Sequence, residues 1–275
     1  MLQQLFTDIA SVWSSYGSVY LNGIKNTLLL AIIATAIGCL IGFICGILQT
    51  IPCSPSDGPV KKVLLKLIRI LVRVYVEVFR GTPMILQAVF IYYGVPYFFG
   101  HVFKSMWAVS IIVVSINTGA YMSESVRGGI LSVDPGQTEG AMAIGMTHFQ
   151  TMLHVILPQA LRNIMPQIGN NYIINVKDTS VMFIIGFSDF FATHKMVSGA
   201  IFKYFPSATI EMVGYLCMTL LASFLLRYLE KKLRGSDNYE LVSEDQLVLT
   251  AGTYNHPGSG SPFDEKSKEY PEVRR

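Results

Sequence analysis

Charged residues are scarce in this sequence: Asp, Glu, Lys and Arg make up 14% of its 275 residues, whereas hydrophobic residues make up 51%. A soluble globular domain usually carries about a quarter charged residues, so the composition excludes an ordinary water-exposed surface. The mean hydropathy of +0.45 points the same way. Because a membrane-spanning helix needs about twenty mostly apolar residues, we predict a multi-span, all-α membrane protein.

Several chemical signals are missing as well. The four cysteines, Cys39, Cys45, Cys53 and Cys217, have neither the spacing of a zinc site nor that of a disulfide framework. No GxxxxGKS or GxxxxGKT phosphate loop occurs, so the chain has no ATPase motor of its own. The first residues lack the basic segment of a cleavable signal peptide. We therefore predict neither a metal site nor an enzyme.

The charge is distributed unevenly, although its sum is only +3. From residue 235 onward there are eight acidic and four basic residues around a Pro- and Gly-rich centre, so we expect a disordered, acidic cytoplasmic tail over 235–275. The rest of the chain is therefore basic, and its bases flank apolar runs instead of forming a separate domain. This pattern favours contact with the cytoplasmic leaflet of a membrane over nucleic-acid binding.

Five apolar stretches are predicted to cross the membrane within a transmembrane domain over 23–234. The predicted spans are 26–48, 83–98, 107–125, 164–187 and 210–228. In the first span Gly38, Gly42 and Gly46 are four residues apart, a spacing that lets another helix approach closely. Residues 1–22 place apolar side chains at helical spacing, and we expect an interfacial segment there.

Basic residues near the span ends set the predicted orientation. One side receives the basic stretch 62–80 and the basic residues that follow the third and fifth spans. Because the stretch 62–80 is amphipathic, we expect it to form an elbow helix on the cytoplasmic surface. The other side receives only Lys25, Lys104, Lys195 and Lys203. Five spans with this bias place the N-terminus outside and the C-terminus in the cytoplasm.

A long amphipathic loop over 127–162 contains the most specific motif of the chain. It reads Glu139-Gly140-Ala141-Met142-Ala143-Ile144-Gly145 and, nine residues later, Val155-Ile156-Leu157-Pro158. Its many apolar residues indicate a docking surface for a partner. The motif resembles the signature of ABC importer permeases, which is E-A-A, three residues, G, nine residues and I-x-L-P. Gly140 and Val155 depart from the commonest form but keep its small or branched apolar character.

Other segments resemble the polar amino-acid branch of this family, the histidine, glutamine and glutamate type of permease. They are Arg80-Gly81-Thr82-Pro83 with Gln87 following, the stretches 117–124 and 127–130, and Lys177-Asp178-Thr179-Ser180. The resemblance covers about residues 27–234 and implies the type I ABC importer permease fold. Local chemistry points to function too, because a charged pair inside a span is costly unless it is paired or faces a wet cavity.

Two sets of candidate site residues follow. The expected substrate pathway comprises Thr82, Gln87, Asn117, Thr118, Tyr121, Glu124, Lys177, Asp178 and Thr179. The expected contacts with an ATPase subunit, implied by the resemblance, are Glu139, Gly140, Ala141, Gly145, Leu157 and Pro158. A zwitterionic substrate needs partners of both signs, and the first set supplies Lys177 as a cation and two carboxylates as anions.

The resemblance implies the transmembrane permease subunit of an ATP-binding-cassette importer, which carries a polar amino acid across the bacterial plasma (inner) membrane. It implies as partners a pair of ATP-binding subunits, a second permease copy or paralogue, and an extracytoplasmic substrate-binding protein. Mg-ATP would bind to the ATP-binding subunits, and this chain would bind no cofactor. Glutamine, glutamate, a basic amino acid and cystine stay open as substrates.

Two other classes of protein also stay open. An ion-coupled secondary transporter would use broken helices and buried charges but would not need an exposed apolar loop. A membrane scaffold or sensor would tolerate substitution of Lys177 and Asp178, whereas a permease would not.

Overall fold

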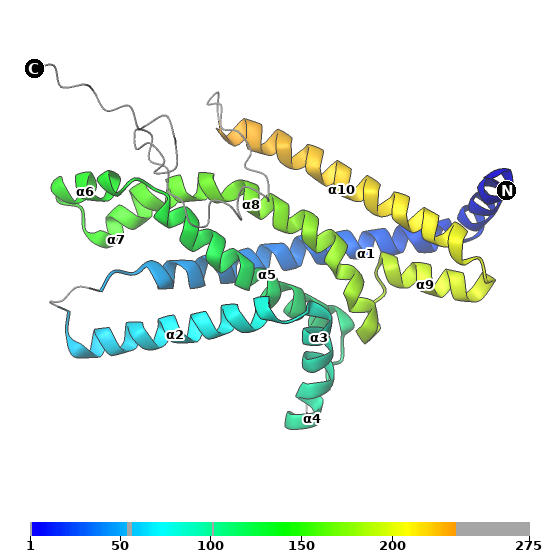
Figure 1. Ribbon diagram of the computed structural model, residues 1–275, viewed down its shortest axis with the longest axis horizontal. Helices are drawn as coiled ribbons and strands as arrows, with labels where there is room; N and C mark the ends of the chain where they lie inside the picture. The colour runs from blue at the N-terminus through cyan, green and yellow to red at the C-terminus, as the bar shows by residue number, and fades with distance from the viewer. Residues whose placement is uncertain (1, 54–56, 101, 235–275) are drawn as a thin grey trace, which may run out of the picture. The chain divides into compact units, whose positions relative to one another are not determined.

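The computed structural model describes residues 2–53, 57–100 and 102–234, and every regular element in these ranges is helical (Figure 1). The elements are α1 (Leu2–Thr50), α2 (Pro59–Gly81), α3 (Met84–Val89), the π-helix η1 (Phe90–Gly94), α4 (Val95–Phe99), α5 (Met106–Leu131), α6 (Pro135–Ala143), α7 (His148–Thr151), the π-helix η2 (Met152–Ile156), α8 (Leu157–Asp178), the 3-10 helix η3 (Thr179–Ile185), α9 (Phe190–Ile201) and α10 (Tyr204–Arg234). The all-α prediction is confirmed. The tail predicted over 235–275 lies outside the described residues.

The first helix, α1, unites the segment predicted at the interface over 1–22 with the first predicted span. It contains no proline, and its glycines stand singly among helix-forming apolar residues, so no local signal ends the helix between them. Val12 and Tyr20 are buried in a cluster with Phe190 of α9. The N-terminal third of α1 therefore packs against protein.

Three glycines of α1 bring its backbone close to α5. A Cβ atom at Gly42 would lie 2.3 Å from Cβ of Met122. At Gly38 and Gly46 a Cβ atom would lie 2.6 Å from side-chain atoms of α5. Only a residue without a side chain fits such contacts, so the close approach predicted from the four-residue spacing is confirmed.

The basic amphipathic helix α2 lies lengthwise beside α1 and α5. Figure 1 shows α1, α2, α5, α8 and α10 running along a common direction. The Tyr75 hydroxyl of α2 donates to the Ile116 carbonyl of α5 (2.6 Å), and Arg69 donates to the Ile51 carbonyl after α1. The residues that α2 buries are Leu65, Val72 and Val76. The segment predicted as an elbow is thus a helix that packs against the bundle along one side, while other apolar side chains of α2, such as Leu67 and Leu71, are exposed.

The second predicted span, 83–98, consists of three short segments, α3, η1 and α4, that project across the common direction (Figure 1). Thr82 is extended and separates α2 from α3, and Pro83 precedes the first turn of α3 as its N-cap. The Thr82 hydroxyl donates back to the Val78 carbonyl (2.7 Å), so it closes α2 instead of capping the next helix. Proline at this position cannot continue a helix, which explains the break.

The fourth predicted span, 164–187, changes geometry along its length. α8 begins inside the predicted loop and ends at Asp178, and the 3-10 helix η3 follows it. Gly186, with φ +87°, then turns the chain into α9, an element that the hydropathy pattern did not predict. The Asp189 carboxylate caps α9 by accepting from the N–H groups of Phe191 (3.2 Å) and Ala192 (2.8 Å).

Among the residues that the structure describes, three helices qualify as membrane spans by length and composition, namely Gln3–Thr50, Met106–Leu131 and Tyr204–Lys232. Met84–Phe99 is apolar but shorter. α2 and α8, with 23 and 22 residues, are shorter than these three but still long enough to cross a membrane, and they carry more charged and polar side chains. Hydropathy therefore identifies three helices of the bundle, and packing identifies the other two.

Candidate functional site

Three polar side chains close the break between α2 and α3. The N–H groups of the Gln87 amide face the carbonyls of Phe79 and Thr82 and the Thr82 hydroxyl, each 2.9 Å from the nitrogen. Asn117 of α5 donates to the Gln87 amide oxygen (3.0 Å) and to the Phe79 carbonyl (3.1 Å). These bonds satisfy carbonyls that the end of α2 leaves without helical partners. Thr82, Gln87 and Asn117 are therefore joined in one hydrogen-bond network.

A second polar group joins α2 to α5. Arg80 forms an ion pair with Glu124, and its guanidinium carbon lies 5.2 Å from the centroid of the Tyr121 ring. The charged side chains are 38% and 47% exposed. Ion pairs as exposed as this one contribute little to the free energy of unfolding. The two charged groups are therefore of interest because they are accessible to a solute, and less because they stabilise the fold. Sequence reasoning placed Arg80 in a motif without naming it as a site residue.

Asn117, Tyr121 and Glu124 lie on one face of α5, because residues three, four and seven apart share a face of a helix. Tyr121 and Glu124 are exposed and Asn117 is partly exposed. The opposite side of α5 is covered by α1, where Met122 is fully buried. α5 has the composition of a membrane span, and an open polar face inside such a helix calls for a water-filled cavity or a polar partner.

Lys177 and Asp178 end α8, and both side chains are exposed. Among the described residues no ion pair joins them to each other or to a third residue. The regular helix changes to a 3-10 helix directly after them. The two charges are thus accessible at a helix break, which is the geometry expected of groups that meet a solute.

Thr118 and Thr179 lie inside the bundle, away from the open face of α5. The Asn175 amide of α8 donates to the Thr118 hydroxyl (2.9 Å) and to the Thr35 hydroxyl of α1 (2.8 Å). Thr179 is buried, and its hydroxyl donates to the Val176 carbonyl (3.1 Å). These residues connect helices. Asn175 was missed from the sequence, although an amide within an apolar stretch is a usable signal of an interhelical hydrogen bond.

The loop predicted over 127–162 contains two short helices, α6 and α7, on either side of Gly145. Gly145 has φ +89°, in the left-handed region that favours glycine. The Met146 N–H donates to the Ala141 carbonyl (3.1 Å) and the Gly145 N–H to the Met142 carbonyl (3.0 Å), which closes α6. Thr147 then caps α7 in a capping box with Gln150.

The tip of this loop exposes large apolar side chains. Ile144 is 81% and Phe149 74% exposed, and Met142 and Leu153 are exposed as well. Of the residues expected to contact an ATPase, Glu139, Gly140, Gly145 and Pro158 are exposed, Leu157 is partly buried and Ala141 is buried. Figure 1 shows α6 and α7 at the same end of residues 2–234 as the start of α2. A contiguous apolar surface on a protruding loop is typical of a protein docking site.

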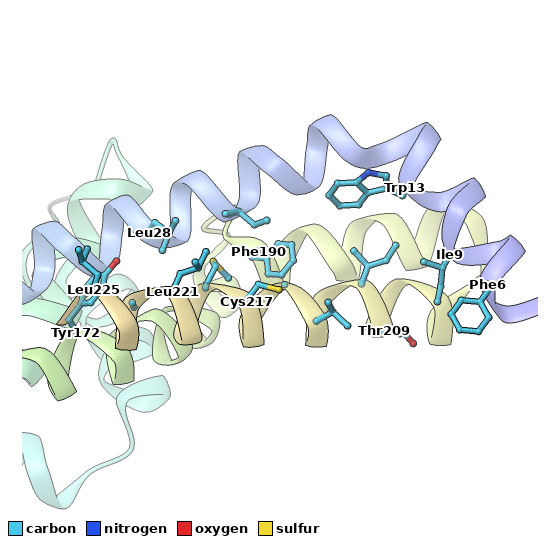
Figure 2. Close-up of a pocket in the computed structure, with 16 residues that line it drawn as sticks. Phe6, Ile9, Trp13, Leu28, Tyr172, Phe190, Thr209, Cys217, Leu221 and Leu225 are labelled. Atoms are coloured by element: carbon cyan, nitrogen blue, oxygen red, sulfur yellow. The ribbon is translucent and has the colours of Figure 1, made fainter. Parts of the chain in front are cut away.

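A cavity of about 770 Å³ lies between α1 and α10 (Figure 2). Its walls are apolar, with Phe6, Trp13 and Leu28 on α1 and Leu221 and Leu225 on α10. None of the predicted site residues lines it. Because a polar solute in such a cavity would find few hydrogen-bond partners, this cavity is a poor route for a zwitterion.

Comparison with known proteins gives a consistent family. Residues 62–235 match the family described as "Binding-protein-dependent transport system inner membrane component". The chain is 32% identical over 227 residues to the glutamine transport system permease protein GlnP of Escherichia coli (strain K12), an alignment that covers 82% of this chain and 98% of the relative. It is 30% identical over 217 residues to the arginine transport system permease protein ArtQ of Bacillus subtilis (strain 168), covering 79% and 93%.

The fold has counterparts among solved structures. A crystal structure of an amino acid ABC transporter with histidines superposes with a TM-score of 0.70 at 33% identity, covering 80% of this chain and 96% of that one. The inward-facing methionine transporter MetNI superposes with a TM-score of 0.66 at 18% identity, covering 80% and 99%, and this second likeness concerns the fold alone.

Proposed function

The chain belongs to the family of binding-protein-dependent transport system inner membrane components and is the permease subunit of an ABC importer for amino acids, and from this premise we propose how its residues divide the work. The open polar face of α5 with Arg80 lines the substrate route, and the α6–α7 loop receives an ATPase subunit. The observation that carries the proposal is the open polar stripe Asn117, Tyr121 and Glu124 on a helix that has the length and hydropathy of a membrane span. As its family name states, the protein is located in the inner membrane.

The substrate is proposed to be a polar amino acid. Relatives are named for glutamine and arginine transport, and both substrates are zwitterions with a nitrogen-bearing polar side chain. Arg80 and Lys177 supply cations for the α-carboxylate, and Glu124 and Asp178 supply carboxylates for the α-amino group. Because this face of α5 is open within one chain, a second permease copy or paralogue would close the route.

The orientation is proposed from the bundle direction. The five helices α1, α2, α5, α8 and α10 would each cross the membrane once. The end of the bundle with α6 and α7 also carries the basic start of α2 and Arg127 and Arg162, and positive residues favour the cytoplasmic side. The N-terminus would then be outside and the end of α10 inside, which places the exposed apolar loop where ATPase subunits are found.

The partners that family membership implies in general are an ATPase and a substrate-binding protein. We propose two ATPase subunits that bind Mg-ATP, an extracytoplasmic binding protein, and no cofactor on this chain. ATP-driven movement of the ATPase pair would push on α6 and α7, and the rigid connection of α8 to the loop would transmit that movement to Lys177 and Asp178 at its other end.

The test is co-purification of the tagged chain from membranes, followed by measurement of amino-acid-stimulated ATP hydrolysis. We expect an ATP-binding subunit to be recovered with the wild type and lost with Gly145→Asp, because a Cβ atom at φ +89° strains the turn and the carboxylate adds a charge beside the exposed apolar side chains of the loop. Glutamine or arginine should raise the hydrolysis rate. Failure to recover any ATP-binding subunit with the wild type, with uptake that persists after ATP depletion, would instead support the secondary transporter.

A further inference from the structure

A cleft of about 390 Å³ lies along the first half of α2, beside the residues that follow α1. Its walls are formed by Cys53, Lys62, Leu65, Lys66, Arg69, Ile70 and Arg73. Four of these seven residues are cations and none is acidic. Like charges gathered in a recess repel one another, and an anion inside the recess would relieve that repulsion.

The Arg69 guanidinium provides a second, independent observation. One of its terminal nitrogens donates to the Ile51 carbonyl, which holds the group in place. Its Nε atom is buried and has no hydrogen-bond partner among the described residues. A buried donor without an acceptor is unfavourable, and guanidinium N–H groups bind phosphate oxygens well. Arg69 lines the cleft, so an anion there would supply the missing acceptor after a small rotation of the guanidinium.

The spacing of the cations fits a ligand that lies along the helix. Lys62, Lys66, Arg69 and Arg73 are four, three and four residues apart and follow one face of α2 over about 16 Å. Lys66 and Arg73 have no ion pair within the part of the chain that the structure describes. The nearby Asp57 already pairs with Lys61 (2.7 Å). Lys61 itself is not among the residues that line the cleft.

We propose that this cleft binds the phosphate group of an anionic phospholipid of the cytoplasmic leaflet. Leu65 and Ile70 supply apolar wall beside the cations, which suits the start of a lipid's hydrocarbon part. The cleft lies at the end of the bundle that carries α6 and α7, where the headgroups of that leaflet would lie. A bound lipid would hold α2 against the end of α1. The proposal goes beyond amino-acid transport and does not depend on which amino acid is carried.

The test is retention of lipid by the purified full-length chain, measured by native mass spectrometry after exposure to phosphatidylglycerol or phosphatidylcholine. We expect phosphatidylglycerol to stay bound to the wild type while phosphatidylcholine is lost. Lys66→Gln with Arg73→Gln should weaken phosphatidylglycerol binding about thirtyfold, since each basic residue near a lipid surface contributes about 1 kcal/mol and tenfold corresponds to about 1.4 kcal/mol. The matched control, Lys231→Gln with Lys232→Gln at the exposed end of α10, removes the same charge and should retain the lipid.

Competition with inorganic phosphate and with soluble glycerol phosphate identifies the source of the ligand. Displacement of phosphatidylglycerol only by other anionic lipids supports the membrane source, whereas displacement by the soluble compounds assigns the phosphate site to a soluble ligand and overturns the lipid. Equal retention of phosphatidylcholine, or equal loss in both double variants, would show diffuse charge attraction and no site. Recovery of the ATPase partner is measured in parallel, so a failure here is distinguishable from a failure of the proposed function.

Discussion

At the residue scale, two glycines of the permease signature, Gly140 and Gly145, differ in why the position holds glycine. Gly145 has open space around it, but its φ of +89° is unfavourable for any side chain. Gly140 lies within α6, also with nothing near its missing Cβ, and its φ is not positive. The commonest form of the motif has alanine at the second position, and the open space at Gly140 explains why both residues fit there.

The two glycines therefore predict opposite effects of the same substitution. Gly145→Ala should destabilise the loop by about 1–2 kcal/mol through backbone strain. Gly140→Ala should stabilise α6 by about 0.5–1 kcal/mol because glycine is a poor helix former. Thermal unfolding of the purified variants, together with recovery of the ATPase partner, measures both. Equal effects of the two substitutions would contradict the assigned conformations.

Gln87 predicts a functional effect at the same scale. Gln87→Ala removes the bonds to Phe79, Thr82 and Asn117 and leaves buried polar groups unpaired, at a cost of about 1–3 kcal/mol. We expect amino-acid uptake to fall about tenfold or more, because the α2–α3 break would lose its geometry. The control is Thr209→Ala, whose hydroxyl bonds only to its own helix. Unchanged uptake at unchanged abundance in Gln87→Ala would rule out a role for this network.

At the element scale, the contact of α1 with α5 depends on small residues. Gly42→Ala would place Cβ 2.3 Å from Cβ of Met122, and neither atom can move away by side-chain rotation. We expect a loss of about 1–3 kcal/mol from overpacking, seen as a lower melting temperature in detergent. Gly199→Ala in α9, where nothing lies near, is the matched control and should not lower the melting temperature. Equal melting temperatures would mean that α1 and α5 are farther apart.

The cap of α9 predicts a pH dependence of stability. Burial raises the pKa of Asp189 to about 6, although N–H groups of Ala192 and Phe191 oppose that shift. The folded-state pKa is above the unfolded value of about 3.9, so the folded chain holds the proton more tightly, and stability falls as the pH rises between these values. The melting temperature of the wild type relative to Asp189→Asn should therefore fall between about pH 4 and pH 7. A constant difference over that range would contradict the burial.

At the scale of the whole molecule, the proposed topology makes the two ends of the bundle chemically distinguishable. Cys53 is exposed beside the start of α2, and Phe202 is 92% exposed in the turn between α9 and α10. We expect a membrane-impermeant maleimide to label Cys53 only in inverted vesicles. In a Cys53→Ser background, Phe202→Cys should be labelled from outside intact cells. The reverse pattern would invert the orientation of all five helices.

Sequence patterns alone determined the class of this protein because the relevant signals are local. Apolar runs predict spanning helices wherever they fold, and the spacing from Glu139 to Pro158 identifies a permease before any contact is known. The division of the loop at Gly145 is also predictable, because a glycine that ends a helix can be recognised from the few residues around it. The close approach of α1 to α5 follows from a local signal as well, because Gly38, Gly42 and Gly46 stand four residues apart.

Only the tertiary structure decided which polar residues face the open side of α5 and which connect helices. Asn117 and Thr118 are adjacent in sequence, yet one joins Gln87 and the other bonds to Asn175 inside the bundle, because one residue turns a helix by about 100° and packing sets which face is covered. Only the tertiary structure likewise shows that Arg80 pairs with Glu124, because the two residues are distant in sequence. It also shows that α2 packs with the bundle, which its many charged residues did not suggest. Rotation and pairing of helices depend on the complementary surfaces of their neighbours, and that information is spread over the whole chain.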